Sequence, residues 1–461
     1  MKSIVDPQGA LARGLAAIRA EFQVPASFPD QVVATAEQAA GRTPSDHADR
    51  TDRPFVTLDP ATSTDLDQAF AIERAGSALL LHYAIADIGW FVEDGDPVDA
   101  EAWRRGTTLY LPDGKAGLYP PVLSEGAASL LPDGPRPAVI FTIRVAPDGI
   151  VHLDGAERAI VRSRAKLGYD AVRPDDLPAD LPELAARIAA AEQARGAARV
   201  DPPEQEVAAD RGGRMELMFR PRLPSEEKNA ALSLAANMAV AAALRAKRTG
   251  LFRVMAEPDA RAVARLRHTA RAFDVAWPDG ETLDCFERRL SARDPKEAAL
   301  MMAIRRAGNG TAYAPFRDGE RPWHAAMAAT YTHATAPLRR LADRYVVRAA
   351  LAVANGRTVE PLVTDAFERL PKVMARAEAL AGRVERAVID LAEAVMLHGR
   401  EGQRFAAIVT DVDERGARVQ LCDRPVLARI DDKGMTPGEA IDLRLVAADP
   451  EARRIAFRRD D

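Results

Sequence analysis

Residues 57–69 read TLDPATSTDLDQA and place three aspartates, Asp59, Asp65 and Asp67, within nine residues. No basic residue lies inside this stretch, so the carboxylates repel one another unless a cation binds among them. Carboxylate oxygens are preferred ligands of magnesium, which proteins commonly share with substrate phosphates. The stretch therefore predicts a divalent-metal site that acts on phosphate. A solvated acidic turn is the alternative on spacing alone, because aspartate-rich turns are common.

The local pattern around the aspartates supports a folded site. Residues 55–59, FVTLD, predict a short buried strand that ends at Asp59, and residues 60–64 predict a turn. Asp65 and Asp67 are two residues apart, so an extended backbone points both to one face and Leu66 to the other. Asp59 joins them if the turn folds back.

Composition limits the class of protein. A chain of 461 residues that is 47% hydrophobic and 28% charged predicts a globular protein of two or three domains. It contains no apolar run long enough to cross a bilayer, no secretory signal at its start and only two cysteines, so we expect a cytoplasmic monomer. The net charge of −5 argues against coating nucleic acid with the whole surface, but it allows a local basic channel.

The order of patterns predicts three parts. Residues 1–50 indicate a short helical segment, residues 51–398 an α/β (α+β) domain and residues 399–461 an all-β domain. Hairpins are expected to turn at Gly76 and at residues 147–149. Helices are expected at residues 9–22, 29–40, 181–200, 225–248, 257–274, 295–306, 337–355 and 362–398.

The last sixty residues contain five short alternating stretches, which predict a small OB-type barrel. Such barrels often hold single-stranded nucleic acid on aromatic side chains. Phe405 and Phe457 are the only aromatic residues here, and a place in the core is at least as good an interpretation as a stacking role. The candidate phosphate contacts are Arg404, Arg424, Arg429, Arg444, Arg458 and Arg459.

Two further motifs carry candidate residues. Tyr110 precedes a Pro-Asp-Gly turn at a predicted strand end, where a tyrosine can stack on a base, although most tyrosines are simply packed. In residues 329–348, Pro337 predicts the first turn of a helix from which Arg339 and Arg340 project toward an anion. An i,i+4 ion pair of Arg339 with Asp343 is expected, although such pairs are commonly ordinary surface pairs.

Two residues just before that predicted helix are further candidates. Thr335 is the candidate helix cap. His333 is a candidate for a hydrogen bond to phosphate or for a structural role, and we do not expect it to bind metal.

With these motifs in order, the chain resembles the RNase II/RNase R (RNB) family of 3′-to-5′ exoribonucleases. The resemblance runs from about Pro54 to Leu397 and continues into a C-terminal OB fold. It is carried by five ordered motifs: PFVTLDPATSTDLDQA, AIADIGWFVEDGDPVDAEAWRRGTTLYLP, LAANMAVA, THATAPLRRLADRYVVR and RVERAV.

The resemblance implies roles for individual residues. Asp59, Asp65 and Asp67 match family aspartates at a magnesium site, and turnover is expected to depend most on Asp67. Tyr110 matches a tyrosine that stacks near the 3′-terminal nucleotide, and Arg339 matches an arginine that holds the scissile phosphate. In RVERAV, Glu385 matches a glutamate near the leaving product.

The chain departs from the family pattern in three places. Gln68 stands where the family usually has a fourth aspartate, so we expect weaker binding of at least one ion and consider Mn²⁺ beside Mg²⁺. The segment FRVMAEPD after Leu251 lacks the aromatic residue that clamps the terminal bases in some members. The N-terminal cold-shock barrels are replaced by some fifty residues with helical signals.

The resemblance therefore implies a processive 3′-to-5′ hydrolase of single-stranded RNA that releases nucleoside 5′-monophosphates by metal-ion catalysis. A family member that binds RNA but is catalytically impaired is the alternative, supported by Gln68 and the few aromatic residues of the OB barrel. A DNA exonuclease is a third hypothesis.

Overall fold

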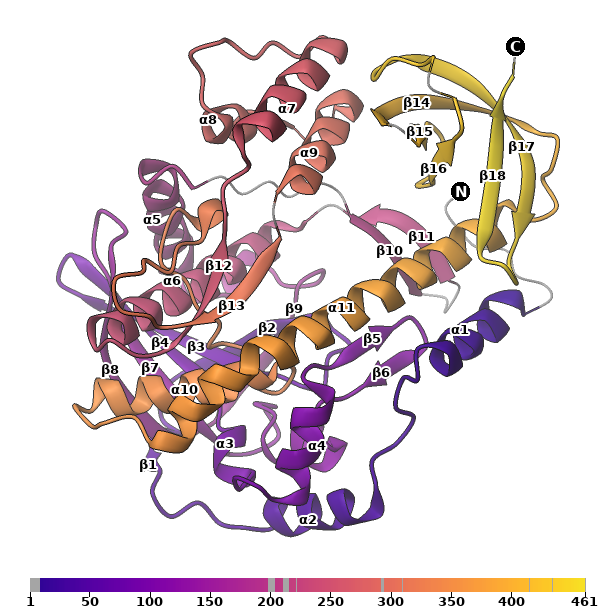
Figure 1. Ribbon diagram of the computed structural model, residues 1–461. Coiled ribbons are helices and arrows are strands. Elements are labelled where there is room, and N and C mark those ends of the chain that lie inside the picture. The colour runs from indigo at the N-terminus through magenta and orange to yellow at the C-terminus, as the bar shows by residue number, and fades with distance from the viewer. Residues whose placement is uncertain are drawn as a thin grey trace.

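In the computed structural model, the described residues are 9–197, 204–209, 215–220, 222–291, 294–308, 310–413, 415–432 and 434–460. Figure 1 shows two main bodies, a large mixed α/β part and a smaller all-β part at the C-terminal end, linked by one long helix. The predicted α/β domain followed by an OB-type barrel is thus confirmed for the described chain. The domain boundaries expected at residues 50 and 398 stay predictions.

The helices have the following bounds: α1 Ala10–Glu21, α2 Asp30–Ala40, α3 Ile88–Phe91, α4 Pro97–Arg105, the π-helix η1 Val122–Ala127, the 3₁₀ helix η2 Pro174–Asp176, α5 Leu181–Ala194, α6 Pro224–Ala246, α7 Ala260–Ala272, α8 Leu283–Arg288, α9 Pro295–Ala307, the 3₁₀ helix η3 Ala325–Met327, α10 Leu341–Ala354 and α11 Pro361–Leu397.

The strands have the following bounds: β1 Ala48–Asp49, β2 Phe55–Asp59, β3 Gln68–Ala75, β4 Ala78–Ala86, β5 Leu109–Leu111, β6 Gly114–Ala116, β7 Arg136–Val145, β8 Val151–Val161, β9 Ser163–Gly168, β10 Glu204–Ala209, β11 Met215–Arg220, β12 Leu251–Met255, β13 Thr311–Pro315, β14 Arg404–Asp413, β15 Gly416–Leu421, β16 Leu427–Ile430, β17 Ala440–Asp449 and β18 Arg454–Arg459.

The main sheet has the strand order β1-β8-β7-β4-β3-β2-β9 within the described residues. Its inner strands pair antiparallel, whereas β1 joins β8 and β9 joins β2 in parallel. Strand β4 is buried along almost its whole length, which explains its nearly unbroken apolar sequence. Helix α6 packs on β4, β7 and β8, and α10 packs on α6 and β8. The strand β2 therefore ends at Asp59 beside a rigid, well-covered sheet.

Helix α11 contains 37 residues and is about 55 Å long at the usual rise per residue. It runs from the α/β part to the C-terminal β-domain (Figure 1). Its first half packs on α10, α4 and β13, and its second half packs on α1, β17 and β18. Helix α11 therefore packs on both domains and joins them.

The C-terminal domain has the strand order β16-β15-β14-β17-β18 within the described residues. The rings of Phe405 and Phe457 are buried in it and meet edge to face at 5.9 Å, so both belong to the core. Of the arginines considered for phosphate contacts, Arg404 and Arg444 pair with Asp460, and Arg459 pairs with Glu439.

The two N-terminal helices pack on different parts of the molecule. Helix α1 lies on α11 and shares an apolar core with the C-terminal domain, whereas α2 packs on α3, α4 and η1. The hairpin β5–β6 contributes Leu109, Leu111 and Ala116 to the same core as α1. The C-terminal domain is thus connected by packing to a hairpin that carries a candidate site residue, Tyr110.

Several expectations need correction. The helix expected from residue 337 begins at Leu341, because residues 337–340 form a tight turn before it. Strands β12 and β13 were not expected from the sequence, and they pair with each other although α7, α8 and α9 lie between them in the chain. The end of the expected helix at 181–200 and the first part of the break at 201–206 lie outside the described residues, and the described helix ends at Ala194.

Candidate active site

Asp67 lies in the loop between β2 and β3, is 4% exposed and is held through both carboxylate oxygens. The backbone N–H of Leu338 donates to Oδ1 at 2.7 Å, and Arg339 Nε lies 3.1 Å from Oδ2. Burial raises the pKa of Asp67 to about 7, and the nearby Asp65 adds to the rise. The ionised form of this carboxyl therefore depends on positive charge near it.

Asp59 is the last residue of β2, and its Oδ2 is buried without a hydrogen-bond partner in the described part of the protein. Burial raises the pKa of Asp59 to about 6, while Arg339 acts in the opposite direction. A buried carboxylate oxygen without a partner is costly unless a donor or a cation occupies the space beside it. Asp59 is therefore a candidate ligand for a cation.

Asp65 lies beside a hairpin that places two side chains on it. Tyr110 of β5 donates its hydroxyl to Oδ2 at 3.1 Å, and Lys115 of β6 places Nζ 2.8 Å from Oδ1. Tyr110 and Lys115 are cross-strand neighbours in this hairpin. Lys115 also lies 3.2 Å from Oε1 of Glu125. The sequence stretch itself contains no basic residue, but the fold brings in positive charge from other elements.

The backbone of Arg339 is fixed by the segment that precedes Tyr110. The carbonyl of Arg339 accepts from Thr108 N at 3.0 Å and from Thr107 Oγ1 at 2.8 Å. Its side chain is 45% exposed while its Nε contacts Asp67. The guanidinium is therefore anchored at one edge and open to an anion at the other.

The expected ion pair of Arg339 with Asp343 does not form. Asp343 is fully buried and pairs with Arg340, with Nε 2.9 Å from Oδ1 and a terminal nitrogen 2.7 Å from Oδ2. Its Oδ2 also accepts from the N–H groups of Thr335 and Ala336. The reason is that α10 begins only at Leu341. Arg339 therefore lies before the helix, and the i,i+4 spacing of a helix does not apply to Arg339 and Asp343. The N-cap residue of α10 is Arg340, so Thr335 does not cap this helix, and its N–H donates to Asp343 instead.

Gln68 lies directly after Asp67, but its side-chain oxygen is occupied elsewhere. Tyr83 donates to Oε1 at 2.6 Å, and Ser233 donates to the same oxygen at 3.2 Å. Gln68 is 6% exposed. A role for Gln68 as a metal ligand stays a prediction, and in the structure it links β3 to β4 and α6.

His333 lies between aromatic side chains. Its Nδ1 is 2.8 Å from the hydroxyl of Tyr313, and burial holds the pKa of His333 well below its usual range. Its ring also meets Tyr331 edge to face. The imidazole is therefore neutral at physiological pH, and any contact with phosphate that it makes is a neutral hydrogen bond.

The carboxylates fit an open metal site. Within the described ranges, no group of three or more His, Cys, Asp or Glu side chains is arranged so that it could hold a metal ion. Magnesium is commonly held by one or two carboxylates together with waters and substrate phosphates. The unpartnered oxygen of Asp59 and the buried Asp67 are two carboxylates of the kind that this pattern requires.

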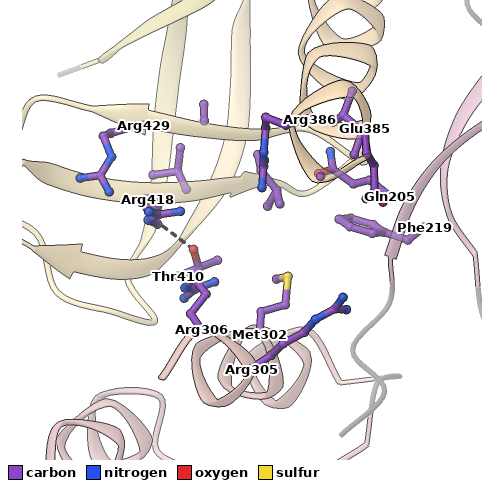
Figure 2. A pocket seen from close by; sticks show the side chains of 15 residues that line it. Gln205, Phe219, Met302, Arg305, Arg306, Glu385, Arg386, Thr410, Arg418 and Arg429 are labelled. Carbon is purple, nitrogen blue, oxygen red and sulfur yellow. Dashed lines mark hydrogen bonds between the residues drawn. The ribbon is translucent and has the colours of Figure 1, made fainter. Parts of the chain in front are cut away.

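Glu385 lies apart from the carboxylates, in a cavity of about 550 Å³ between α9, α11 and the C-terminal domain. Figure 2 shows the arginines that surround this space. Arg305 and Arg306 come from α9, Arg386 from α11, Arg418 from β15 and Arg429 from β16. Two aromatic or apolar side chains, Phe219 and Met302, complete the near wall. The cavity is suited to a polyanion.

Sequence reasoning named one of the cavity arginines, Arg429, as a candidate phosphate contact. It missed Lys115, Glu125 and the other cavity arginines, which are Arg305, Arg306, Arg386 and Arg418. A signal for Lys115 existed, because a strand–turn–strand over residues 109–116 makes it the cross-strand partner of Tyr110. Glu125 and the cavity arginines come from elements far apart in the chain, so no local pattern connects them.

The comparisons with known proteins agree with this architecture. Residues 47–355 match the model of the RNB domain, and residues 403–460 match that of the RNase II-type exonuclease C-terminal S1 domain. Fold and site thus define a two-domain protein of the RNB class. The chain belongs to the RNB family of exoribonucleases, and its sequence-based recognition is confirmed.

The curated relatives are similar over most of this chain. Ribonuclease R of Aquifex aeolicus is 25% identical over 95% of this chain and 69% of its own length. Ribonuclease R of Escherichia coli K12 is 26% identical over 87% of this chain and 53% of its own length. Exoribonuclease 2 of Klebsiella pneumoniae strain 342 is 28% identical over 82% of this chain and 61% of its own length. The chain thus spans about half to two thirds of the length of such relatives.

Solved structures share the fold. Mycoplasma genitalium RNase R in complex with ribose-methylated single-stranded RNA has a TM-score of 0.86 at 20% identity, covering 98% of this chain and 78% of that one. Yeast Ssd1, described as a pseudonuclease, has a TM-score of 0.65 at 14% identity, and the match covers 93% of this chain and 56% of that one. The fold alone therefore does not decide whether a member cleaves RNA.

Proposed function

We propose that this protein is a 3′-to-5′ exoribonuclease that hydrolyses single-stranded RNA processively and releases nucleoside 5′-monophosphates. The observation that carries the proposal is the pair formed by buried Asp67 and half-exposed Arg339, with Tyr110 beside it. Family membership makes RNA the substrate class. The named activities of the relatives support this assignment.

Each side chain has a role that follows from its position. Arg339 binds the scissile phosphate through the open edge of its guanidinium and neutralises charge that develops there. Tyr110, 55% exposed, stacks on a terminal base, and stacking suits cleavage that ignores sequence. Water attacks phosphorus, the bond to the 3′ oxygen breaks, and the shortened RNA keeps a free 3′ hydroxyl.

The proposed cofactor is a divalent ion, Mg²⁺ or Mn²⁺, held by Asp59 and Asp67, with Asp65 beside them. When bound, such an ion supplies charge stabilisation at phosphate and lowers the pKa of a bound water. The chain's own contribution is to keep both carboxylates buried near Asp65 and Arg339, with their pKa values raised until the ion binds. Arg339 keeps its Nε on Asp67 and offers the open edge of its guanidinium to the phosphate.

The arginine cavity at the C-terminal domain is the proposed path for the RNA backbone upstream of the cleaved bond. Arg386 and Arg418 point into it and form no ion pair within the described residues. Glu385 lies on the same wall, where it can contact ribose hydroxyls. Arg340 and His333 support the site from behind, through Asp343 and Tyr313.

Cellular location belongs to the same proposal. Both cysteines, Cys285 and Cys422, are free and exposed, which suits the reducing cytoplasm. Among the described residues no helix has the length and apolar character that a bilayer crossing requires. We propose a protein that acts as a monomer on RNA.

The test uses 5′-labelled single-stranded RNA with Mg²⁺ or Mn²⁺. We expect a ladder that shortens from the 3′ end, and Asp67→Asn should lower the rate by about 10²-fold or more because charge stabilisation is lost. RNA binding by Asp67→Asn should be retained, which serves as the control for folding. Cleavage inside a circular RNA would contradict the proposal.

A second candidate function is RNA binding without cleavage. It is favoured by Gln68, which is a neutral amide next to Asp67 and whose side-chain oxygen already accepts hydrogen bonds from Tyr83 and Ser233. Tight binding of RNA without mononucleotide release, in either metal ion, would establish it. Release from DNA but not from RNA would instead support a DNA exonuclease.

A further inference from the structure

Lys115 occupies a point on which two carboxylates converge. Its Nζ lies 2.8 Å from Asp65 Oδ1 and 3.2 Å from Glu125 Oε1, and its side chain is 22% exposed. The other oxygen of each carboxylate is also bound, Oδ2 of Asp65 by Tyr110 and Oε2 of Glu125 by Thr64. The four contacts fix both carboxylates around one positive charge.

That arrangement resembles a cation site in which an ammonium replaces the ion. Lysine carries a compact point charge, and three N–H donors suit carboxylate oxygens. Removing Nζ would leave the two carboxylates on either side of a space that a small cation can fill, with no positive charge between them. Asp59 and Asp67, in contrast, have no lysine within ion-pair distance in the described chain, and Asp59 Oδ2 has no partner.

We propose that Lys115 takes the place of a second divalent ion, so that the chain binds one metal ion, at Asp59 and Asp67, and uses Lys115 as the fixed charge at Asp65 and Glu125. This inference rests on the proposed function for the metal itself. It assigns to Lys115 and Glu125 a role in the site that none of the sequence motifs described above predicted. Lys115 is a positioning residue, because it acts through Asp65 and Tyr110.

The test counts ions on the full-length, RNA-free chain at pH 8. Mn²⁺ is titrated by calorimetry, and bound Mn²⁺ is counted by electron paramagnetic resonance. We expect one ion per wild-type chain and two per Lys115→Met chain. Lys115→Arg should keep one ion, because it keeps the charge, and Lys115→Met combined with Glu125→Gln should return the count to one, because the new site loses a carboxylate.

Two results would overturn the inference: two ions on the wild-type chain, or one ion on a folded Lys115→Met chain. Thermal melting reports folding, and Lys115→Gln, with the same expected count of two, replaces Lys115→Met if the latter is unfolded. A wild-type chain that binds no Mn²⁺ and releases no mononucleotide contradicts the proposed function as well. One ion on both wild-type and Lys115→Met chains, with RNA cleavage intact, contradicts this inference alone.

Discussion

Tyr110 combines two contacts that can be separated by substitution. Its hydroxyl orients Asp65, while its ring is largely exposed and available to a base. Tyr110→Ala should weaken binding of short RNA by about 1–3 kcal/mol, because one base loses its stacking partner, and should change the length of the final product. Tyr110→Phe keeps the ring and is the matched control.

The readout is the size of the last fragment on a denaturing gel, together with the affinity of a four-nucleotide RNA. Tyr110→Phe should leave fragment length unchanged and lower the rate modestly, because only the bond to Asp65 is lost. If both substitutions change fragment length equally, the hydroxyl and not the ring sets the product, and the stacking role is wrong.

The raised pKa values at the site predict how metal affinity depends on pH. Asp67 has a pKa of about 7 and Asp59 a pKa of about 6, both raised by burial, so protons compete with the ion below these values. A raised carboxyl pKa means more of the protonated form at a given pH, hence weaker metal binding as pH falls. The apparent Mn²⁺ affinity should drop about tenfold per pH unit just below pH 7 and more steeply below pH 6.

Calorimetric titration of Mn²⁺ between pH 5.5 and pH 8.5 checks this expectation. In Asp67→Asn the change near pH 7 should disappear, while the change near pH 6 from Asp59 remains. An affinity that is constant from pH 8 to pH 6 would show that neither carboxyl must lose a proton for the ion to bind.

At the scale of elements, Asp343 connects the start of α10 to the turn that carries Arg339. It accepts two backbone N–H groups, from Thr335 and Ala336, and the guanidinium of Arg340. Asp343→Ala should destabilise the fold by about 3 kcal/mol or more, because it leaves a buried arginine and two buried donors without a partner. The rate of RNA cleavage should fall even if the variant folds, because the position of Arg339 depends on this turn.

Asp343→Asn is the matched control, because it keeps the size and one acceptor but loses the charge. Denaturant unfolding should rank wild type above Asp343→Asn and both above Asp343→Ala. The corresponding substitution at Asp94, whose partner Arg348 also pairs with Glu360, should have a small effect. A similar loss at both positions would mean that the buried contacts of Asp343 have no special part in stability.

The sequence predicted well those elements whose signals are local. Helix α6 begins at Pro224 as expected, and the strand over Phe55–Asp59 and the five C-terminal strands lie where alternation placed them. Local pattern could not give the start of α10, because Asp343 binds backward to residues 335 and 336 through the fold. It also could not pair β12 with β13, since α7 to α9 intervene.

The candidate site was predictable in part for the same reason. Asp59, Asp65 and Asp67 are neighbours in the chain, so spacing alone suggested that they gather. Their counter-charges Arg339 and Lys115 come from a distant turn and a separate hairpin, and only tertiary structure places them at 3.1 Å and 2.8 Å from carboxylates. The sequence thus indicates where negative charge collects, but not how the chain balances it.

At the scale of the whole molecule, a basic cavity lies between α9, α11 and the C-terminal domain. Figure 1 shows the C-terminal strands well apart from β2, the strand that ends at Asp59. If RNA passes through both, a long RNA contacts the cavity and the active site, whereas a very short RNA contacts the active site alone. The double substitution Arg386→Gln and Arg418→Gln should therefore weaken binding of a twenty-nucleotide RNA and leave cleavage of a four-nucleotide RNA unchanged.

Salt dependence gives this prediction a second readout. Each phosphate contact that is lost should lower the slope of log affinity against log salt by about 0.7 for a single strand, so two lost contacts should lower it by about 1.4. Arg404→Gln combined with Arg444→Gln is the matched control, because it removes two arginines of the same domain that pair with Asp460 outside the cavity lining. If both double substitutions change the salt slope equally, the domain attracts RNA through its overall charge and the cavity is no specific path. If the slope falls only for the cavity pair, and only with long RNA, the RNA path runs through the space between α9, α11 and the C-terminal domain.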